Sequence, residues 1–195
     1  LHYHVRDIFA PVAALPIADG DVLNVFITSD LPESTVVDVQ VRAFDFNGKS
    51  LSDVETKGLT VSPDSSKLVW KGTFRTILHK EKAENAVIEC LVKDTTGKVI
   101  NRRLYYHTPP RKLNLPVVKV RIDKVEQVNE GYLLYFSTPK LAKNVLIGTQ
   151  AEGFFSDNYF DLLPNERKTV LFRTETLLDD PKNAFTTRSL SDTYE

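Results

Sequence analysis

The sequence is poor in the residues that mark several common functional classes. It has no methionine, one cysteine, and eight glycines that stand singly rather than in a phosphate-binding loop. One thiol cannot form an internal disulfide. Cys90 alternates with Ala86, Ile88 and Val92 on one side of an apolar run, which predicts a buried and inert side chain. A G-x-S-x-G elbow is also missing, so a nucleophilic triad of that type is not expected.

Charge and hydrophobicity exclude further classes. The chain holds 25 Lys and Arg against 26 Asp and Glu, for a net charge of −1, and has no strongly basic block. A nucleic-acid partner is therefore not expected. Apolar runs stay well short of the roughly 18–20 residues that cross a bilayer, so no membrane partner is expected either. The N-terminus does not resemble a signal peptide, and without a methionine we expect an excised segment or a processed product.

Apolar and polar residues alternate with a period of two along most of the chain. In "VVDVQVRAFD" (36–45), valines and an alanine alternate with Asp38, Gln40 and Arg42, the pattern of a strand with one buried face. Asn47-Gly48 predicts a type I′ hairpin turn. The expected strands of the first half lie near 9–15, 21–29, 36–45, 51–61, 67–74, 85–93 and 99–107.

A proline-rich stretch, "HTPPRKLNLPVV", then interrupts the pattern. Its three prolines cannot lie inside a ladder because they lack the N–H donor, so we expect a domain boundary near 110–114. The sequence thus predicts an all-β protein with two consecutive antiparallel β-sandwiches, residues 1–111 and 112–195. The expected strands of the second lie near 117–124, 131–138, 143–149, 154–162, 168–175 and 184–190.

Candidate chemistry is sparse. His2 and His4 share the H-x-H spacing of a metal site, but no third His or Cys lies nearby. Asp157 and Asp161 are four residues apart, about 13 Å in an extended strand, too far to flank one glycosidic bond without a bend. Trp70 lies on an apolar parity, which indicates core rather than a sugar-binding platform. We therefore predict no catalytic, cofactor-binding or metal-ligating residues and no cofactor.

The stretch "FFSDNYFDLLPNERKTV" (154–170) is the most distinctive. It predicts a strand over 154–162 that Pro164 stops, with Asp157, Asn158 and Asp161 capping backbone groups at the corner. The stretch resembles the signature of the last immunoglobulin-like domain of β-mannosidases, glycoside hydrolases of the clan of β-galactosidase and β-glucuronidase. The matching positions are Phe155, Ser156, Asp157, Asn158, Tyr159, Phe160, Asp161, Leu162, Leu163 and Pro164.

Other stretches are similar to that family in the same order. They are "LHYHVRDIFAPVAALP", "FDFNGKSL", "PDSSKLVW", "TPPRKLNLP", "LAKNVLI" and "SLSDTY". One departure is Asn165, where the family usually has Gly at the turn, and Asn also tolerates positive φ. The resemblance implies that 1–111 is the penultimate and 112–195 the C-terminal immunoglobulin-like sandwich of such an enzyme.

The resemblance also sets the functional expectation. Family members carry two catalytic glutamates on a (β/α)₈ barrel and cleave terminal β-D-mannose residues with retention, and no residue here matches those motifs. We expect this chain alone to be no enzyme, and to stabilise or dock on the barrel and other domains of the same polypeptide. Direct carbohydrate binding, a stand-alone interaction or adhesion sandwich, and a homodimer contact stay open as alternatives.

The expected location also depends on the resemblance. The sequence contains no N-x-S/T sequon and no pair of cysteines, which favours a bacterial over a glycosylated lysosomal origin. We therefore expect an extracytoplasmic protein of the bacterial periplasm. The substrate preference of the parent enzyme does not follow from the residues.

Overall fold

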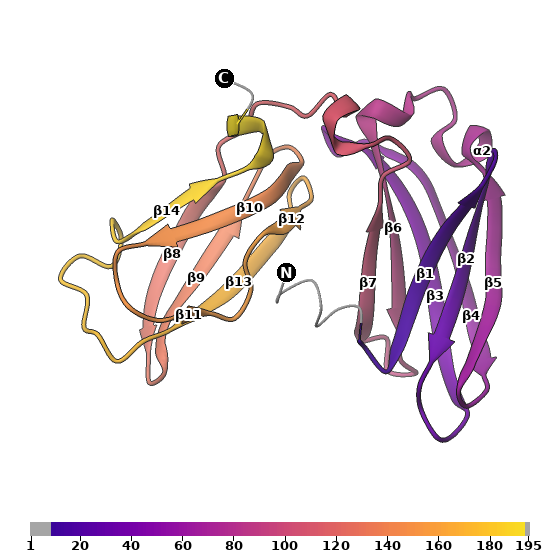
Figure 1. The fold of residues 1–195 in the computed structure, drawn as a ribbon, viewed down its shortest axis with the longest axis horizontal. Coiled ribbons are helices and arrows are strands. Elements are labelled where there is room, and N and C mark those ends of the chain that lie inside the picture. Colours follow the sequence, from indigo (N-terminus) through magenta and orange to yellow (C-terminus); the bar gives the residue numbers. More distant parts are fainter. Residues whose placement is uncertain (1–8, 194–195) are drawn as a thin grey trace. The chain divides into compact units, whose positions relative to one another are not determined.

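A computed structural model describes residues 9–193 of the chain (Figure 1). These residues divide into two compact units. Unit 1 contains residues 9–45 and 49–114, and unit 2 contains residues 46–48 and 115–193. Each unit consists of two antiparallel sheets, so the predicted all-β fold with two β-sandwiches is confirmed.

Unit 1 pairs a three-stranded sheet, β1-β2-β5, with a four-stranded sheet, β4-β3-β6-β7. All seven predicted strands are present, but the short helix α2 was not predicted. The strands are β1 (Val12–Asp19), β2 (Val22–Ser29), β3 (Thr35–Asp45), β4 (Ser50–Val61), β5 (Ser65–Thr73), β6 (Ala86–Lys93) and β7 (Val99–Tyr105). The helical turns are α2 (Phe74–Leu78), η1 (Ala83–Asn85) and η2 (Pro110–Lys112).

The core of unit 1 lies between these two sheets. Alternate residues of β2 and β3 face it and are almost fully buried, as the period of two predicts. Cys90 on β6 belongs to the same core, with 0% of its surface exposed. Burial raises the pKa of its thiol to about 12. The predicted burial of this cysteine is confirmed.

A β-bulge in β5 changes the predicted alternation. Trp70 lies opposite Val25, but Leu68 lies opposite Phe26, so the ladder skips Val69. Trp70 therefore faces the core as predicted, whereas Leu68 lies on the opposite face of the sheet and is 44% exposed. The indole ring of Trp70 lies over Gly72, where an added Cβ would come within 2.6 Å of it.

The β3–β4 turn forms at Asn47-Gly48, but it is not of type I′. The backbone N–H of Asp45 donates to the Lys49 carbonyl, which leaves three residues in the loop. Gly48 has φ +93°, whereas Asn47 is not among the residues with positive φ. A three-residue loop with one left-handed glycine needs only that one special position, so the hairpin was predicted correctly and its turn type was wrong.

Unit 2 pairs a four-stranded sheet, β11-β13-β9-β8, with a three-stranded sheet, β12-β10-β14. The strands are β8 (Arg121–Val128), β9 (Gly131–Ser137), β10 (Ala142–Thr149), β11 (Phe154–Phe155), β12 (Phe160–Leu162), β13 (Arg167–Arg173) and β14 (Phe185–Arg188), followed by the turn η3 (Leu190–Thr193). The single strand predicted over 154–162 was wrong, because β11 and β12 are two short strands in different sheets.

Aromatic rings dominate the core of unit 2. Phe172 lies between Phe155 and Phe185, at centroid distances of 4.8 and 5.4 Å, and Phe136 meets the edge of Phe160 at 5.8 Å. Tilted and edge-to-face contacts of this kind add to the free energy gained by burying the rings. The core thus holds β11 and β12, although each strand is very short.

Within residues 9–193, no helix has the length and apolar character needed to cross a membrane.

Candidate functional site

The segment Ser156–Pro164, which contains most of the predicted signature, crosses from one sheet of unit 2 to the other. It leaves β11 beside β13 and enters β12 beside β10. A segment that passes from one sheet to the other loses its ladder hydrogen bonds. The backbone N–H and C=O groups of the adjacent strands therefore need other partners. The polar side chains of the signature supply them.

The first two polar residues bind β13. The backbone N–H of Ser156 donates to the Leu171 carbonyl at 2.7 Å, and the Ser156 hydroxyl accepts the Leu171 N–H at 2.9 Å. Next to it, a carboxylate oxygen of Asp157 lies 2.7 Å from the Lys168 ammonium. These contacts extend the β11–β13 pairing beyond the last residue of β11.

Asn158 binds β10 in the way that a strand would. Its side-chain oxygen accepts the Ile147 N–H at 2.8 Å, and its side-chain nitrogen donates to the Ile147 carbonyl at 3.0 Å. The β10–β12 ladder pairs Val145 with Phe160, so its next step would place residue 158 opposite Ile147. The amide of Asn158, only 6% exposed, therefore replaces a backbone peptide group at this position.

Tyr159 explains why a side chain is needed there. Its φ is +59°, which breaks the extended conformation and turns the backbone away from β10. The Asn158 oxygen also accepts the Tyr159 N–H at 3.0 Å, which fixes the bend. The Tyr159 ring is 47% exposed.

Asp161 holds the bulge in β10. The β10–β12 register shifts between Ala142 and Val145, where Asn144 has φ +51°. One oxygen of Asp161 accepts the Asn144 N–H at 2.7 Å, and the other binds the Lys143 ammonium at 2.9 Å. Because both ionic side chains are nearly buried, at 11% and 12% exposed, the pair is held in one geometry.

The end of the signature is a tight turn. Asn165 has φ +61°, the conformation that its sequence position predicted. The Glu166 carboxylate accepts the Leu163 N–H at 3.0 Å, and the Glu166 N–H donates to the Leu163 carbonyl at 3.1 Å. Leu162 and Leu163, just before the turn, are buried.

The expectation that Asp157 and Asp161 lie about 13 Å apart assumed one extended strand, and that strand is interrupted. The estimate of about 13 Å between the two carboxylates therefore does not apply. The contacts of the two carboxylates indicate their role, because each is paired with a lysine and accepts a hydrogen bond from a backbone N–H. Carboxylates held in this way stabilise the corner.

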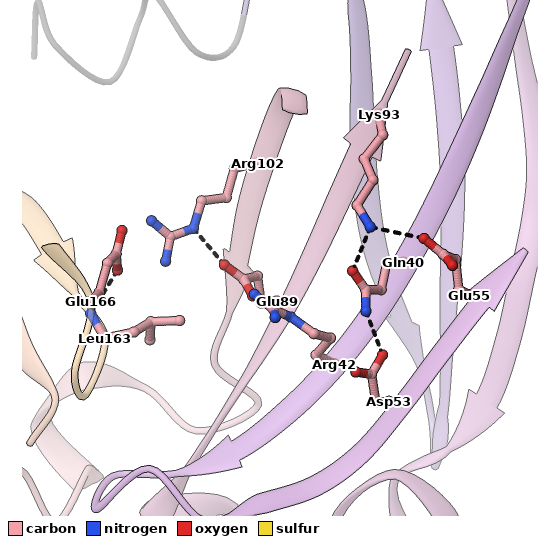
Figure 2. Close-up of polar contacts among 9 residues, drawn as sticks. All are labelled: Gln40, Arg42, Asp53, Glu55, Glu89, Lys93, Arg102, Leu163 and Glu166. Carbon is pink, nitrogen blue, oxygen red and sulfur yellow. Dashed lines mark hydrogen bonds and ion pairs between the residues drawn. The ribbon is translucent and has the colours of Figure 1, made fainter. Parts of the chain in front are cut away.

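A second group of ionic side chains lies on the outer face of the sheet β4-β3-β6-β7 (Figure 2). Glu89, at the centre, is 2% exposed. Arg102 donates to one of its oxygens from Nε at 2.6 Å, and Arg42 donates to the other from Nε at 2.8 Å and from Nη2. With both oxygens bound by guanidinium groups, Glu89 on β6 links Arg42 on β3 to Arg102 on β7.

The same face continues as a chain of hydrogen bonds. Lys93 donates to Gln40 and to Glu55, each at 2.8 Å, and Gln40 donates to Asp53 at 2.7 Å. The bond from Lys93 lowers the pKa of the Glu55 carboxyl. Arg42 and Glu89 lie opposite each other on this face, in adjacent strands.

We searched residues 9–193 for side chains that could ligate a metal ion. They contain no group of three His, Cys, Asp or Glu side chains arranged to hold an ion. His2 and His4, the H-x-H pair, lie outside residues 9–193.

The outer face of the sheet β1-β2-β5 differs from the polar face of its partner sheet. Leu15, Phe26 and Leu68 form one row across the three strands, and Ile17 lies in the next row beside Asn24. Leu15, Ile17 and Leu68 are 44–45% exposed. These four apolar residues are termed the apolar row below, and a patch of this kind on a sheet marks an interaction surface more often than a monomer's free face.

Comparison with known families assigns both units. Residues 21–112 match the model of a mannosidase Ig/CBM-like domain, and residues 114–193 match the model of the Ig-fold domain of mannosidases. The chain consists of the immunoglobulin-like domains of the β-mannosidase family.

Relatives of the β-mannosidase type match almost the whole chain. β-Mannosidase A of Neosartorya fischeri is 25% identical over 98% of this chain. The crystal structure of β-D-mannosidase from Dictyoglomus thermophilum shares the fold over 97% of it, with a TM-score of 0.77 at 18% identity. Exo-chitosanase CsxA of Amycolatopsis orientalis shares it less closely, with a TM-score of 0.57 at 14% identity.

This chain spans only about a quarter of the proteins it matches, 22% of β-mannosidase A and 23% of the Dictyoglomus enzyme. A replication initiator protein of Streptococcus uberis also matches, at 29% identity over 147 residues and 30% of its length. The two domain models assign residues 21–112 and 114–193 to mannosidase domains and not to a replication initiator. We therefore draw no functional argument from this match.

Replacing Asn158 tests the structural role of the signature. Asn158→Ala leaves the Ile147 N–H and carbonyl without partners in a buried position, at about 1–3 kcal/mol for each group. We expect the free energy of unfolding of unit 2 to fall by about 2–4 kcal/mol, measured by urea titration of amide NMR signals from β10 and β13. Asn183→Ala, in an exposed loop, should change it by less than about 0.5 kcal/mol. Equal effects of the two substitutions would contradict the assigned role.

Proposed function

We propose that this chain is the non-catalytic C-terminal accessory region of a β-mannosidase, whose complete polypeptide hydrolyses terminal β-D-mannose residues with retention. One observation carries the proposal. Both β-mannosidase domain types occur in tandem, and a curated β-mannosidase aligns with 98% of this chain while extending far beyond it. The retaining mechanism is proposed by analogy with the family.

The chemistry of the described residues supports a non-catalytic role. A retaining glycosidase needs two carboxyl groups about 5–5.5 Å apart, one to protonate the leaving group and one to attack. The carboxylates held most firmly here are Glu89, Asp157 and Asp161, and all three are engaged by cationic side chains. A (β/α)₈ barrel takes about 250 residues, more than this chain contains.

The isolated chain is therefore expected to release no p-nitrophenol from p-nitrophenyl β-mannoside above the rate of a buffer blank. A β-mannosidase polypeptide that includes the barrel serves as the positive control in the same assay. Hydrolysis by the isolated chain, with activity that persists through repeated purification and scales with its concentration, would refute the non-catalytic assignment.

We further propose that the apolar row is the surface by which unit 1 docks on other domains of the same polypeptide. A sandwich needs one apolar face per sheet, towards its core, and the sheet β1-β2-β5 has apolar residues on both. Burying Leu15, Ile17 and Leu68 against a partner would recover roughly 25 cal/mol for each Å² of apolar surface. The charged outer face of the opposite sheet offers no comparable gain.

Polar substitution in the apolar row separates docking from folding. Leu15→Gln with Leu68→Gln should leave the thermal midpoint of the isolated chain unchanged, since both side chains are half-exposed. In the polypeptide that includes the barrel, the same pair should lower the midpoint by several degrees. Val36→Gln, 41% exposed on the other sheet, is the control and should do neither. Unchanged midpoints in both contexts would exclude this surface.

A carbohydrate-binding module is the alternative. It is favoured by the CBM-like description of residues 21–112 and by two exposed aromatic side chains of unit 2, Phe154 at 79% and Tyr159 at 47%. Trp70 does not contribute a platform, because its ring packs on Gly72 and the core. Calorimetric titration of the isolated chain with β-mannosides distinguishes the two, since binding heat supports the module and its absence supports the accessory role.

Location and assembly extend the proposal. We propose that the parent enzyme acts outside the cytoplasm, in a bacterial periplasm, which is compatible with a sequence free of N-x-S/T sequons. A homodimer contact in the parent is a further proposal, which the molar mass of the enzyme in solution would test.

A further inference from the structure

An open hollow lies at one end of unit 1, where the start of β4 meets helix α2 and the loop after it. Its volume is about 570 Å³. The residues that line it are Lys49, Ser50, Leu51, Arg75, Leu78, His79, Lys80 and Glu81. All of them belong to unit 1, so the hollow exists within that unit alone.

The lining is strongly cationic. Lys49, Arg75 and Lys80 carry three positive charges against the single carboxylate of Glu81. None of the three forms an ion pair with a residue that the structure describes. Three like charges around one concave surface repel one another and focus a positive potential into it, and a bound anion relieves both effects.

The carboxylate of Glu81 is engaged in hydrogen bonds within its own loop. One of its oxygens accepts the Lys82 N–H at 3.1 Å and the side-chain N–H of Asn85 at 2.9 Å, which braces the loop between α2 and η1. The neighbouring Asp45 carboxylate accepts the Lys49 backbone N–H at 2.9 Å and closes the β3–β4 turn. The two acids thus serve the loops that frame the hollow, and the cationic side-chain groups remain for a ligand.

The rest of the lining fits a compact molecule with one polar and one apolar side. Leu78 is buried and Leu51 packs against the core, so together they give the hollow an apolar floor. The Ser50 hydroxyl and the His79 imidazole add hydrogen-bonding groups. The volume falls within the range of small-molecule sites. His79 has φ +54°, a backbone conformation that residues other than glycine adopt rarely and that is often found where a ligand binds.

We propose that this hollow is a binding site for a small oxyanion-bearing ligand, with Arg75, Lys49 and Lys80 contacting the anionic group and the two leucines contacting its ring or carbon skeleton. A guanidinium can hold a carboxylate, sulfate or phosphate through two parallel hydrogen bonds, and the lysines add charge without fixed geometry. The site shares no residue with the signature corner or with the apolar row, and it does not depend on the proposed function.

The test is a titration of the isolated chain with three probes, followed by amide NMR shifts. D-glucuronate and inorganic phosphate carry the oxyanion with and without a ring, and D-glucose carries the ring alone. We expect saturable shifts at Leu51, Leu78 and Lys80 with glucuronate, weaker ones with phosphate, and none with glucose. Stronger binding of phosphate than of glucuronate would assign the site to a free phosphate group and remove the role of the leucines.

A pair of charge-matched variants separates a site from general electrostatic attraction. Arg75→Gln with Lys80→Gln should raise the Kd for glucuronate at least about tenfold. Lys119→Gln with Lys182→Gln removes the same charge from exposed positions of unit 2 and should change Kd less than about twofold. An unchanged unfolding midpoint shows that both variants fold. Equal weakening by both pairs, equal binding of glucose, or no saturation below about 10 mM would each overturn the proposal.

Discussion

The hydrogen bonds between the Asn158 side chain and the backbone of Ile147 are the contacts on which the C-terminal sandwich depends. The chain must leave one sheet after Phe155 and join the other at Phe160, and a strand cannot bend that sharply while keeping its ladder. The bend at Tyr159 solves the geometry but removes a backbone partner from the centre of β10. An amide side chain carries the same donor and acceptor as a peptide group, so asparagine can replace it.

The other polar residues of the signature solve the same problem at neighbouring positions. Ser156 and Asp157 secure the departure from β13, and Asp161 secures the bulge of β10 where β12 begins. Each side chain has its own backbone or lysine partner. The polar residues of the signature, which could suggest sugar chemistry, thus have structural partners in the fold.

Strands and buried faces that follow the alternation of apolar and polar residues were predicted from the sequence. Bulges and bends that interrupt this alternation were not. Period-two runs located every strand of unit 1, and the valines of β3 face the core as predicted. The bulge at Val69 was not foreseeable, because the extra residue leaves the apolar pattern intact while reversing the face of Leu68. The bend at Tyr159 was missed for a related reason, since tyrosine rarely takes a positive φ and only its tertiary partners enforce one.

For the site too, residue types could be interpreted from the sequence, whereas contacts between distant strands could not. The capping role of Asp157, Asn158 and Asp161 followed from residue type, but their individual partners required the fold. The ion pairs of Glu89 could not be predicted from the sequence, because Arg42 lies 47 residues away on β3 and the pairing of β3 with β6 depends on the fold. The cationic hollow likewise joins Lys49 to residues 75–81, whose proximity no spacing in the sequence reveals.

Amide hydrogen exchange at Ile147 measures how strongly the Asn158 side chain holds β10. If the Asn158 side chain replaces a strand, the Ile147 amide should exchange as slowly as the ladder amides of β9 and β13, through the global unfolding of unit 2. Exchange of Ile147 at the rate of an exposed loop amide, while the ladder amides stay protected, would show that this bond does not hold the sandwich together.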